Sequence, residues 1–206
     1  HMSIVASGGT LDYLYDTQKT ALSHILTLNY YNVSDFMLID VSTRRNLELV
    51  ETLRDKNKKG SLLWVLDKTK TAMGARLLKK WIEQPLLNKN EIIKRQDAVE
   101  SFKNNPIGRE EVKELLNAVY DFERIMSKLV YGTVNARDLI ALKSSISVLG
   151  PIKTVLSDFE SNWQKETLDN FDTLDDIYTL IDNAIIEEPP LAVKEAGIIK
   201  DGFNED

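Results

Sequence analysis

The sequence predicts an all-α fold, and three observations support that prediction. Only 14 of the 206 residues are Gly or Pro (9 and 5), so few positions interrupt regular structure. No stretch alternates apolar and polar residues for more than about five residues, whereas many segments repeat apolar residues at the 3.6-residue period of a helix. Hydrophobic residues make up 43% of the chain, enough for one sizeable core. We therefore expect a multi-helical scaffold with at most one or two short strands.

The first quarter of the chain predicts two helices and one strand. Thr10 is expected to cap a long amphipathic helix over residues 11–26. The run from Phe36 to Ile39 is short, apolar and bounded by aspartates, so it is the expected strand. Ser42 then starts a predicted helix that extends to about residue 53.

Two more helices are predicted before Pro85. Residues 62–66 follow a Gly-Ser break and are expected to form a short buried helix that places Trp64 in the core. Thr71 is expected to cap a second helix, which must end at or before the proline.

The helix after Thr71 separates its apolar and charged residues completely on a helical wheel. Gly74 falls in the middle of the apolar face, which also carries Trp81. Glycine inside a helix costs about 1 kcal/mol relative to alanine. We therefore expect Gly74 to lie at a crossing with another helix, and Trp81 to be a core residue.

The rest of the chain predicts six further helices. Gly132 is typical of a helix end, Asn135 with Asp138 of a helix start, and Pro151 of a first helical position. The expected ranges are residues 90–102, 109–120, 121–131, 135–150, 151–163 and 174–185.

Cysteine and histidine usage removes several classes of chemistry. The chain has no cysteine, which excludes a disulfide framework, a cysteine nucleophile and a thiolate metal site. Of its two histidines, His1 belongs to a His-Met start typical of a cleaved expression tag, and His24 is expected to be an ordinary surface residue. The chain therefore has too few histidines for a histidine metal triad, and no suitable histidine for Ser-His-Asp catalysis.

Other sequence features argue against nucleotide, metal and membrane binding. Neither G-x-x-x-x-G-K-[ST] nor G-x-G-x-x-G occurs, and residues 59–61 carry K-G-S in the reverse order. Acidic residues at 169, 172, 175 and 176 lack the spacing of a calcium loop and suit a helix start. The longest aliphatic and aromatic run, residues 62–66, is far shorter than the ~20 residues of a membrane span. We expect no catalytic, cofactor-binding or metal-binding residue here, and a cytoplasmic protein.

Charge is segregated along the chain. Residues 54–95 contain 12 Lys or Arg against 4 Asp or Glu, a net charge of +8, which leaves −14 for the rest of a chain whose total is −6. A basic segment can attract the phosphate backbone of nucleic acids whatever the net charge. The alternative is a solvated face that also pairs with the acidic half. The candidate weak phosphate contacts are Lys56, Lys58, Lys59, Lys79 and Lys80.

Four passages, taken in order, resemble the core domain (domain III) of the MutS family of DNA mismatch repair proteins. They are residues 9–14 (G-T-L-D-Y-L), 40–49 (D-V-S-T-R-R-N-L-E-L), 60–85 (which include A-M-G-A-R-L-L) and 121–146 (which include D-F-E-R-I and N-A-R-D-L). One such string is weak evidence, but four in the family order over this length are specific.

The resemblance implies a longer protein that surrounds duplex DNA as a homodimer, detects mismatches and works with a MutL-type repair partner. It also implies ATP and Mg²⁺ in an ATPase domain outside this chain, so no family catalytic residue has a matching position here. Residues 6–196 would form the core, preceded by a tag remnant and flexible start (1–5) and followed by a lead-in to a clamp (197–206). The implied role is mechanical, linking the clamp and mismatch-reading domains to the ATPase.

Two other functions remain to be weighed against the scaffold. An autonomous helical protein-interaction module would have the same helical periodicity. A hydrolase is less favoured, because no group of residues supports it.

Overall fold

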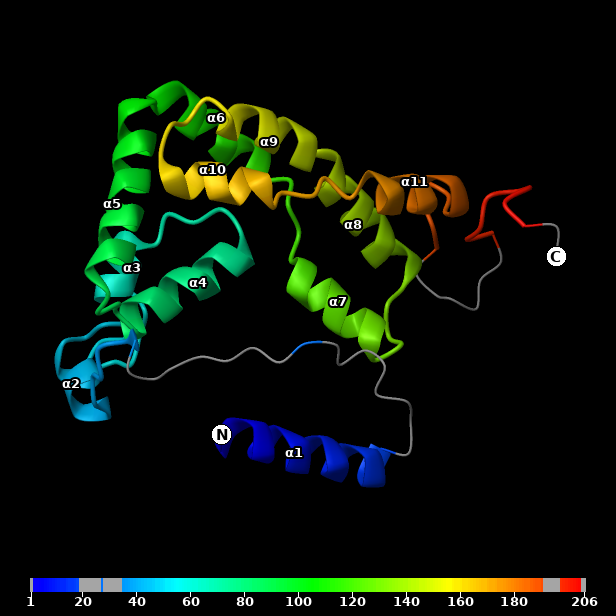
Figure 1. Cartoon of the computed structure of the whole chain (residues 1–206). Coiled ribbons are helices and arrows are strands. Elements are labelled where there is room, and N and C mark those ends of the chain that lie inside the picture. The colour runs from blue at the N-terminus through cyan, green and yellow to red at the C-terminus, as the bar shows by residue number, and fades with distance from the viewer. Residues whose placement is uncertain (1, 19–26, 28–34, 191–196, 205–206) are drawn as a thin grey trace. The chain divides into compact units, whose positions relative to one another are not determined.

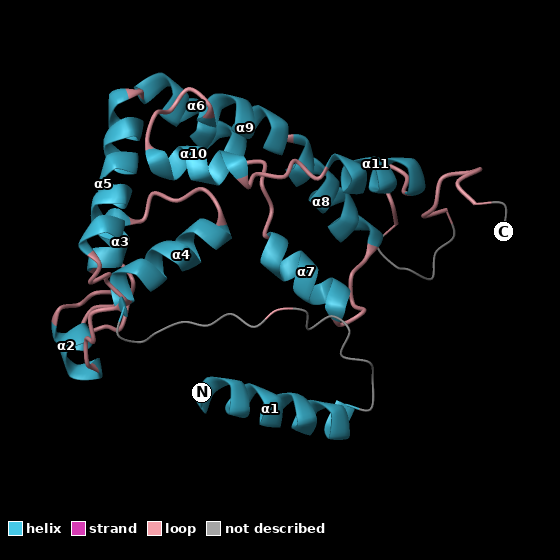
Figure 2. Cartoon of the chain, viewed as in Figure 1, coloured by secondary structure: helices cyan, strands magenta, loops and turns pink. Residues whose placement is uncertain are grey.

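The computed structural model describes residues 2–18, 27, 35–190 and 197–204. The chain divides into two compact units, residues 1–33 and 34–206. Among the described residues there are helices, turns and loops but no strand (Figure 2). The prediction of an all-α fold is therefore confirmed.

The first unit contains helix α1 (Met2–Gln18). It starts earlier than predicted, and Thr10 is not its cap, because the Thr10 hydroxyl lies inside the helix and donates to the Ala6 carbonyl at 2.9 Å. His24 lies outside the described residues.

The second unit contains the remaining described helices (Figure 1). They are α2 (Val41–Asn46), α3 (Leu62–Leu66), α4 (Ala72–Glu83), α5 (Lys89–Asn104), α6 (Pro106–Leu116), α7 (Phe122–Val130), α8 (Ala136–Ser147), α9 (Leu149–Leu156), α10 (Asn162–Asp169) and α11 (Asp175–Ala184).

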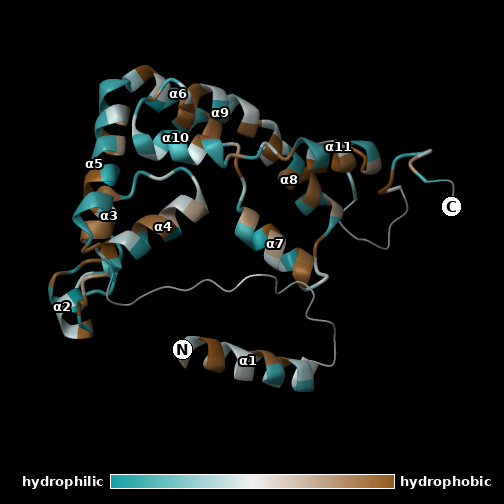
Figure 3. Cartoon of the chain, in the orientation of Figure 1, coloured by the Kyte–Doolittle hydropathy of each residue, from teal (hydrophilic) through white to brown (hydrophobic). Residues whose placement is uncertain are grey.

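Two apolar clusters form the core of this unit. The first joins α7, α8 and α11 through buried residues that include Ile125, Ile146 and Ile181. The second joins α6 and α9 around Phe159, whose ring also packs on Phe102 of α5 at 4.5 Å between ring centroids. Brown and teal segments alternate along α7 and α8, as expected of helices with one face in a core (Figure 3).

One stretch, Ala136–Leu156, is long and apolar enough by length and composition to cross a membrane. It comprises α8 and α9, and six of its apolar residues are buried members of the two clusters: Ala136, Leu142, Ile146, Ile152, Val155 and Leu156. The core helices of a folded domain satisfy the same criterion.

The predicted strand at residues 36–39 is wrong. Phe36 makes only an isolated antiparallel bridge to Leu86, with the Met37 N–H donating to the Pro85 carbonyl at 2.8 Å. The Leu87 N–H donates to the Asp35 carbonyl at 3.1 Å on the other side of the bridge, and residues 37–39 form no ladder. A second isolated bridge joins Ile185 to Ile199.

Several predicted helix ends are also wrong. Asp40, not Ser42, caps α2, and the helix stops at Asn46 because Glu48 takes a left-handed conformation (φ 49°). Asn105 caps α6, so Pro106 takes its first position and the helix starts before residue 109. The predicted helix over 151–163 is two helices, α9 and α10, since the chain leaves α9 to bury Phe159 in the core.

Other starts and ends are confirmed. Ser61 caps α3 and Thr71 caps α4, each accepting a backbone N–H. Asp121 caps α7, which is followed by Gly132 at φ 67°. Asn135 and Asp138 form a reciprocal capping box at the start of α8. These helices start where a short polar side chain precedes an apolar repeat.

Three expectations about packing are wrong. A β-carbon at Gly74 would meet the side chains of Thr71 and Thr69, 3.1 Å and 3.5 Å away, so the close neighbour is the loop before α4 and not another helix. Trp64 is 47% exposed, and α3 is not a buried helix. Trp81 is half-buried beneath an arginine.

Candidate functional site

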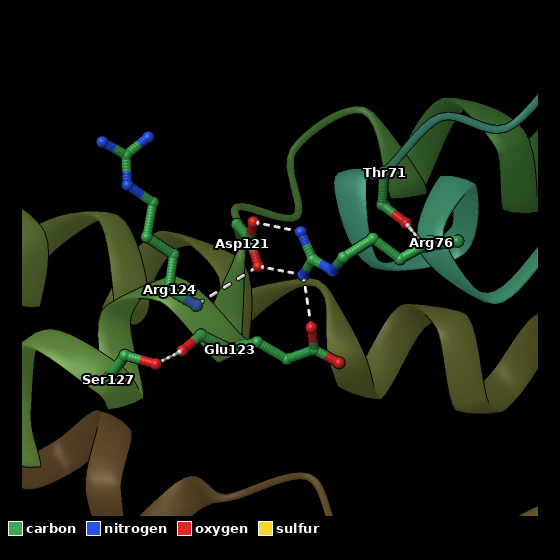
Figure 4. A network of polar contacts seen from close by, with 7 residues as sticks. Thr71, Arg76, Asp121, Glu123, Arg124 and Ser127 are labelled. Carbon is green, nitrogen blue, oxygen red and sulfur yellow. Dashed lines mark hydrogen bonds and ion pairs between the residues drawn. The ribbon is translucent and has the colours of Figure 1, made fainter. Parts of the chain in front are cut away.

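A network of ion pairs joins α4 to α7 (Figure 4). The Arg76 guanidinium on α4 donates to both carboxylate oxygens of Asp121, at 2.8 Å and 2.6 Å. Its Nη2 also lies 2.5 Å from the Glu123 carboxylate. A planar guanidinium that binds a carboxylate through two parallel bonds fixes orientation as well as distance. We call Arg76, Asp121 and Glu123 the α4–α7 network.

Local structure places these side chains. Thr71 caps α4 by accepting the Gly74 N–H at 3.0 Å, and Arg76 follows in the next turn. Asp121 caps α7, and its carboxylate also accepts the Arg124 N–H at 3.3 Å. One carboxylate therefore starts α7 and holds α4.

The chain just before α7 is attached to α8. The Tyr120 N–H donates to the Ser145 hydroxyl at 2.8 Å, and Ser145 is fully buried. Lys128 of α7 binds Asp138 of α8 at 2.7 Å. The position of α4 is thus coupled to α7 and, through α7, to the first apolar cluster.

The charges in the network stabilise each other. Hydrogen bonding from Arg76 lowers the pKa of the Asp121 carboxyl, although partial burial opposes the shift. The same bond raises the pKa of the Arg76 guanidinium. Both groups are charged at neutral pH. Arg76 is 48% exposed, so the network is accessible to salt.

Helix α5 links α4 to α10 through two neighbouring residues. The Arg95 guanidinium lies 3.7 Å from the centre of the Trp81 ring of α4, a cation–π contact. Burial lowers the pKa of the Arg95 guanidinium. Lys94 forms an ion pair with Glu166 of α10.

Three of the five candidate lysines lie together. Lys56, Lys58 and Lys79 line one groove of about 440 Å³ beside Leu63 and Arg76. Lys59 and Lys80 are exposed and do not line it.

The groove is partly neutralised by acids of the same unit. Lys58 binds Asp67 at 2.5 Å, and this hydrogen bond, with one from Thr69, lowers the pKa of the Asp67 carboxyl to about 2. Arg76 is held by Asp121 and Glu123. Ion pairs within the second unit therefore neutralise part of the basic charge of residues 54–95.

No group of three or more metal-ligating side chains occurs among the described residues. In the acidic stretch before α11, the Asp172 carboxylate accepts the Leu174 N–H at 2.9 Å, and Asp175 accepts the Thr173 hydroxyl at 2.7 Å. These contacts agree with a helix start.

Comparison with known proteins decides the family. Residues 42–201 match the family model for MutS domain III. The chain belongs to the MutS domain III family. It is 54% identical over 203 residues to the DNA mismatch repair protein MutS of Acetivibrio thermocellus and 55% identical over 203 residues to that of Ruminiclostridium cellulolyticum, and both alignments cover 98% of this chain. It is 50% identical over its whole length to the protein of the same name from Alkaliphilus oremlandii.

The chain spans 23% of the length of these three relatives. The family match includes α2 to α11, and with them every residue of the α4–α7 network.

Sequence reasoning did not find this network. Helical periodicity indicates only that Arg76 belongs to the charged face of its helix, and a cap pattern indicates only that Asp121 starts one. Their pairing spans 45 residues of sequence, and no local pattern indicates it.

Proposed function

We propose that this chain is a structural core of a DNA mismatch repair protein and acts by holding other domains in a fixed relation. The supporting observation is the MutS domain III match over residues 42–201, together with relatives that are named DNA mismatch repair protein MutS. The alignments with these relatives cover nearly the whole chain, which favours the role of a structural core over that of an autonomous interaction module.

The contacts between helices suit a rigid element that holds other domains in a fixed relation, which we call the strut. The α4–α7 network and the Lys94–Glu166 pair join helices that are distant in sequence, and the Arg95–Trp81 contact joins α4 to the next helix, α5. A movement imposed on α4 would therefore displace α5 and α7 together. Coupling between two distant sites needs such an element, whose arrangement both sites can bias.

We further infer the setting in which the strut works. The longer protein would bind mismatched duplex DNA as a homodimer, hydrolyse ATP with Mg²⁺ in a domain outside these residues, and act with a MutL-type partner in the cytoplasm. This chain would contribute no catalytic or cofactor-binding residue.

The lysine groove would add only weak, sequence-independent contacts to phosphate. Its members Lys56, Lys58 and Lys79 are exposed, as are Lys59 and Lys80. Neutralising a few phosphates gives salt-sensitive affinity of about 10⁻⁴ M.

A domain replacement tests the strut. The matching segment of the Acetivibrio thermocellus relative would be exchanged for this chain, and ATP hydrolysis measured with a G·T duplex and with a matched duplex. We expect the Arg76→Ala protein to keep its basal ATP hydrolysis. Its rate of hydrolysis should no longer differ between the G·T duplex and the matched duplex. Lys113→Ala, which breaks a pair within α6, is the control. An unchanged difference in the Arg76→Ala protein would contradict the strut.

A further inference from the structure

Helix α3 is apolar on every side, yet most of it is exposed. Its five residues are L-L-W-V-L, and of these only Leu63 is buried, at 6% exposure. The other four range from 42% to 56% exposed: Leu62, Trp64, Val65 and Leu66. A helix that is hydrophobic all round is normally enclosed by protein. We call these four residues the α3 knob.

The backbone of α3 is held firmly despite this exposure. Ser61, at 1% exposure, caps the helix by accepting the Trp64 N–H at 3.2 Å, and its own hydroxyl donates to the Lys58 carbonyl at 2.7 Å. The Leu62 and Leu63 N–H groups donate to the carbonyls of residues 48 and 49, at 3.0 Å and 2.9 Å. The knob is thus already ordered, which lowers the entropy cost of binding.

The surroundings of the knob are strongly basic. Residues 56–80 contain eight Lys or Arg against one acid, a net charge of +7. The single acid, Asp67, is already bound to Lys58. Besides the paired Lys58, three exposed lysines flank α3 directly in sequence: Lys59, Lys68 and Lys70.

An apolar centre with a charged rim is typical of a protein interface. Protein interfaces place aromatic and aliphatic anchors at the centre and polar residues around them. Contacts to duplex DNA are made mainly by polar and basic side chains. Four large apolar side chains on one short helix therefore favour a protein partner, and the lysines require that partner to be acidic.

We propose that the α3 knob docks an acidic amphipathic helix of a partner protein. The apolar stripe of that helix covers Trp64 and the neighbouring leucines, and its aspartates and glutamates face the flanking lysines. This surface is distinct from the α4–α7 network, and the inference does not depend on the strut.

A pair of designed peptides tests the proposal on the 206-residue chain. Both are helices of about 20 residues with the same leucine stripe. One carries glutamate on the polar face and the other carries lysine. Fluorescence anisotropy of the labelled peptides gives the affinities. We expect the glutamate peptide to bind at least about tenfold more tightly than the lysine peptide.

Variants assign the binding to the knob. The double substitution Trp64→Ser and Leu66→Ser should lower the affinity for the glutamate peptide by about tenfold or more. The double substitution Lys59→Glu and Lys68→Glu should lower this affinity as well. Leu180→Ser removes an equally exposed leucine, at 60%, from α11 and should change nothing. Circular dichroism of each variant verifies that the helices are retained.

Three results would overturn the proposal. One is equal affinity for the two peptides, which includes no binding of either. Another is binding that survives the Trp64 and Leu66 substitutions. The third is displacement of the glutamate peptide by a duplex DNA at about 10 µM, far below the ~10⁻⁴ M range of weak non-specific contacts. That displacement would make the basic face a nucleic-acid site.

Discussion

Asp121 uses one carboxylate for two contacts, capping α7 and binding Arg76 of α4. A side chain with both roles links local structure to tertiary structure, because losing it would free a helix start and an ion-pair partner at once. Asp138 resembles it, since it belongs to the α8 capping box and binds Lys128. In both cases the residue that starts a helix also attaches it to another helix.

Replacing Arg76 tests the α4–α7 network at this scale. We expect Arg76→Ala to lower the melting temperature of the chain, and Arg76→Lys to restore only part of the loss, because lysine lacks the planar fork. The difference in melting temperature between Arg76→Ala and the parent should shrink at about 1 M salt, where charges are screened within about 3 Å. Lys113→Ala should have a smaller effect, since its partner Glu110 lies in the same helix.

The Asp67 carboxylate predicts part of the acid sensitivity of the chain. Hydrogen bonds from Lys58 and Thr69 lower its pKa from 3.8 to about 2 in the folded protein. Because the folded pKa lies below the unfolded one, this stabilisation is present above about pH 4 and is lost as the pH falls toward about 2. Acid titrations of Asp67→Asn, followed by circular dichroism, should show a smaller loss of stability across that window than the parent. An identical slope would contradict the assignment.

At the scale of elements, α6 packs against the segment that follows α9 closely enough for a single methyl group to matter. Gly108 of α6 is buried, and a β-carbon there would lie 2.8 Å from the Asn105 side-chain nitrogen and 3.1 Å from Phe159 Cζ. Asn105 is the cap of α6 and Phe159 belongs to the second apolar cluster. Neither neighbour can move without loss of a contact.

Two glycine substitutions therefore have opposite expected effects. Gly108→Ala should lower the free energy of unfolding by about 1–3 kcal/mol, the usual range for overpacking. Gly150→Ala in α9 should raise it by about 0.4–1 kcal/mol, because alanine restricts the unfolded chain and no atom lies within 4 Å of the added carbon. Urea denaturation of both variants measures the two values. A destabilising Gly150→Ala or a neutral Gly108→Ala would contradict the packing described for these helices.

At the scale of the whole molecule, the described residues carry helices and ion pairs but no phosphate-binding loop. Some of their basic residues, such as Arg76 and Lys94, pair with acids of other helices. The sequence contains no G-x-x-x-x-G-K-[ST] motif, whose backbone amides and lysine enclose a nucleotide phosphate.

We expect the isolated chain neither to hydrolyse ATP nor to distinguish a G·T duplex from a matched duplex. Mismatch recognition requires a side chain inserted at a deformable base step, and the sequence identifies none here. Phosphate release and fluorescence anisotropy at two salt concentrations measure both activities. Tenfold tighter binding to the mismatch, about 1.4 kcal/mol, would show that this domain reads DNA itself.

The all-α fold class, most of the residues at which helices begin, and the family can be derived from the sequence alone. Thr71, Asp121 and Asn135 were identified as starts because a cap is a contact over three residues, which a local pattern contains. The four MutS-like passages were recognisable for the same reason, since each is a continuous string.

Only the tertiary structure decided which apolar faces are covered and which charges are paired. The periodicity of α3 is that of a buried helix, yet Leu63 is its only buried residue and Trp64 is exposed. Phe159 ends α9 because its burial outweighs one more helical turn. Arg76 and Asp121 meet across 45 residues. Such contacts depend on how distant segments pack, and their free energy belongs to the folded chain and not to any window of its sequence.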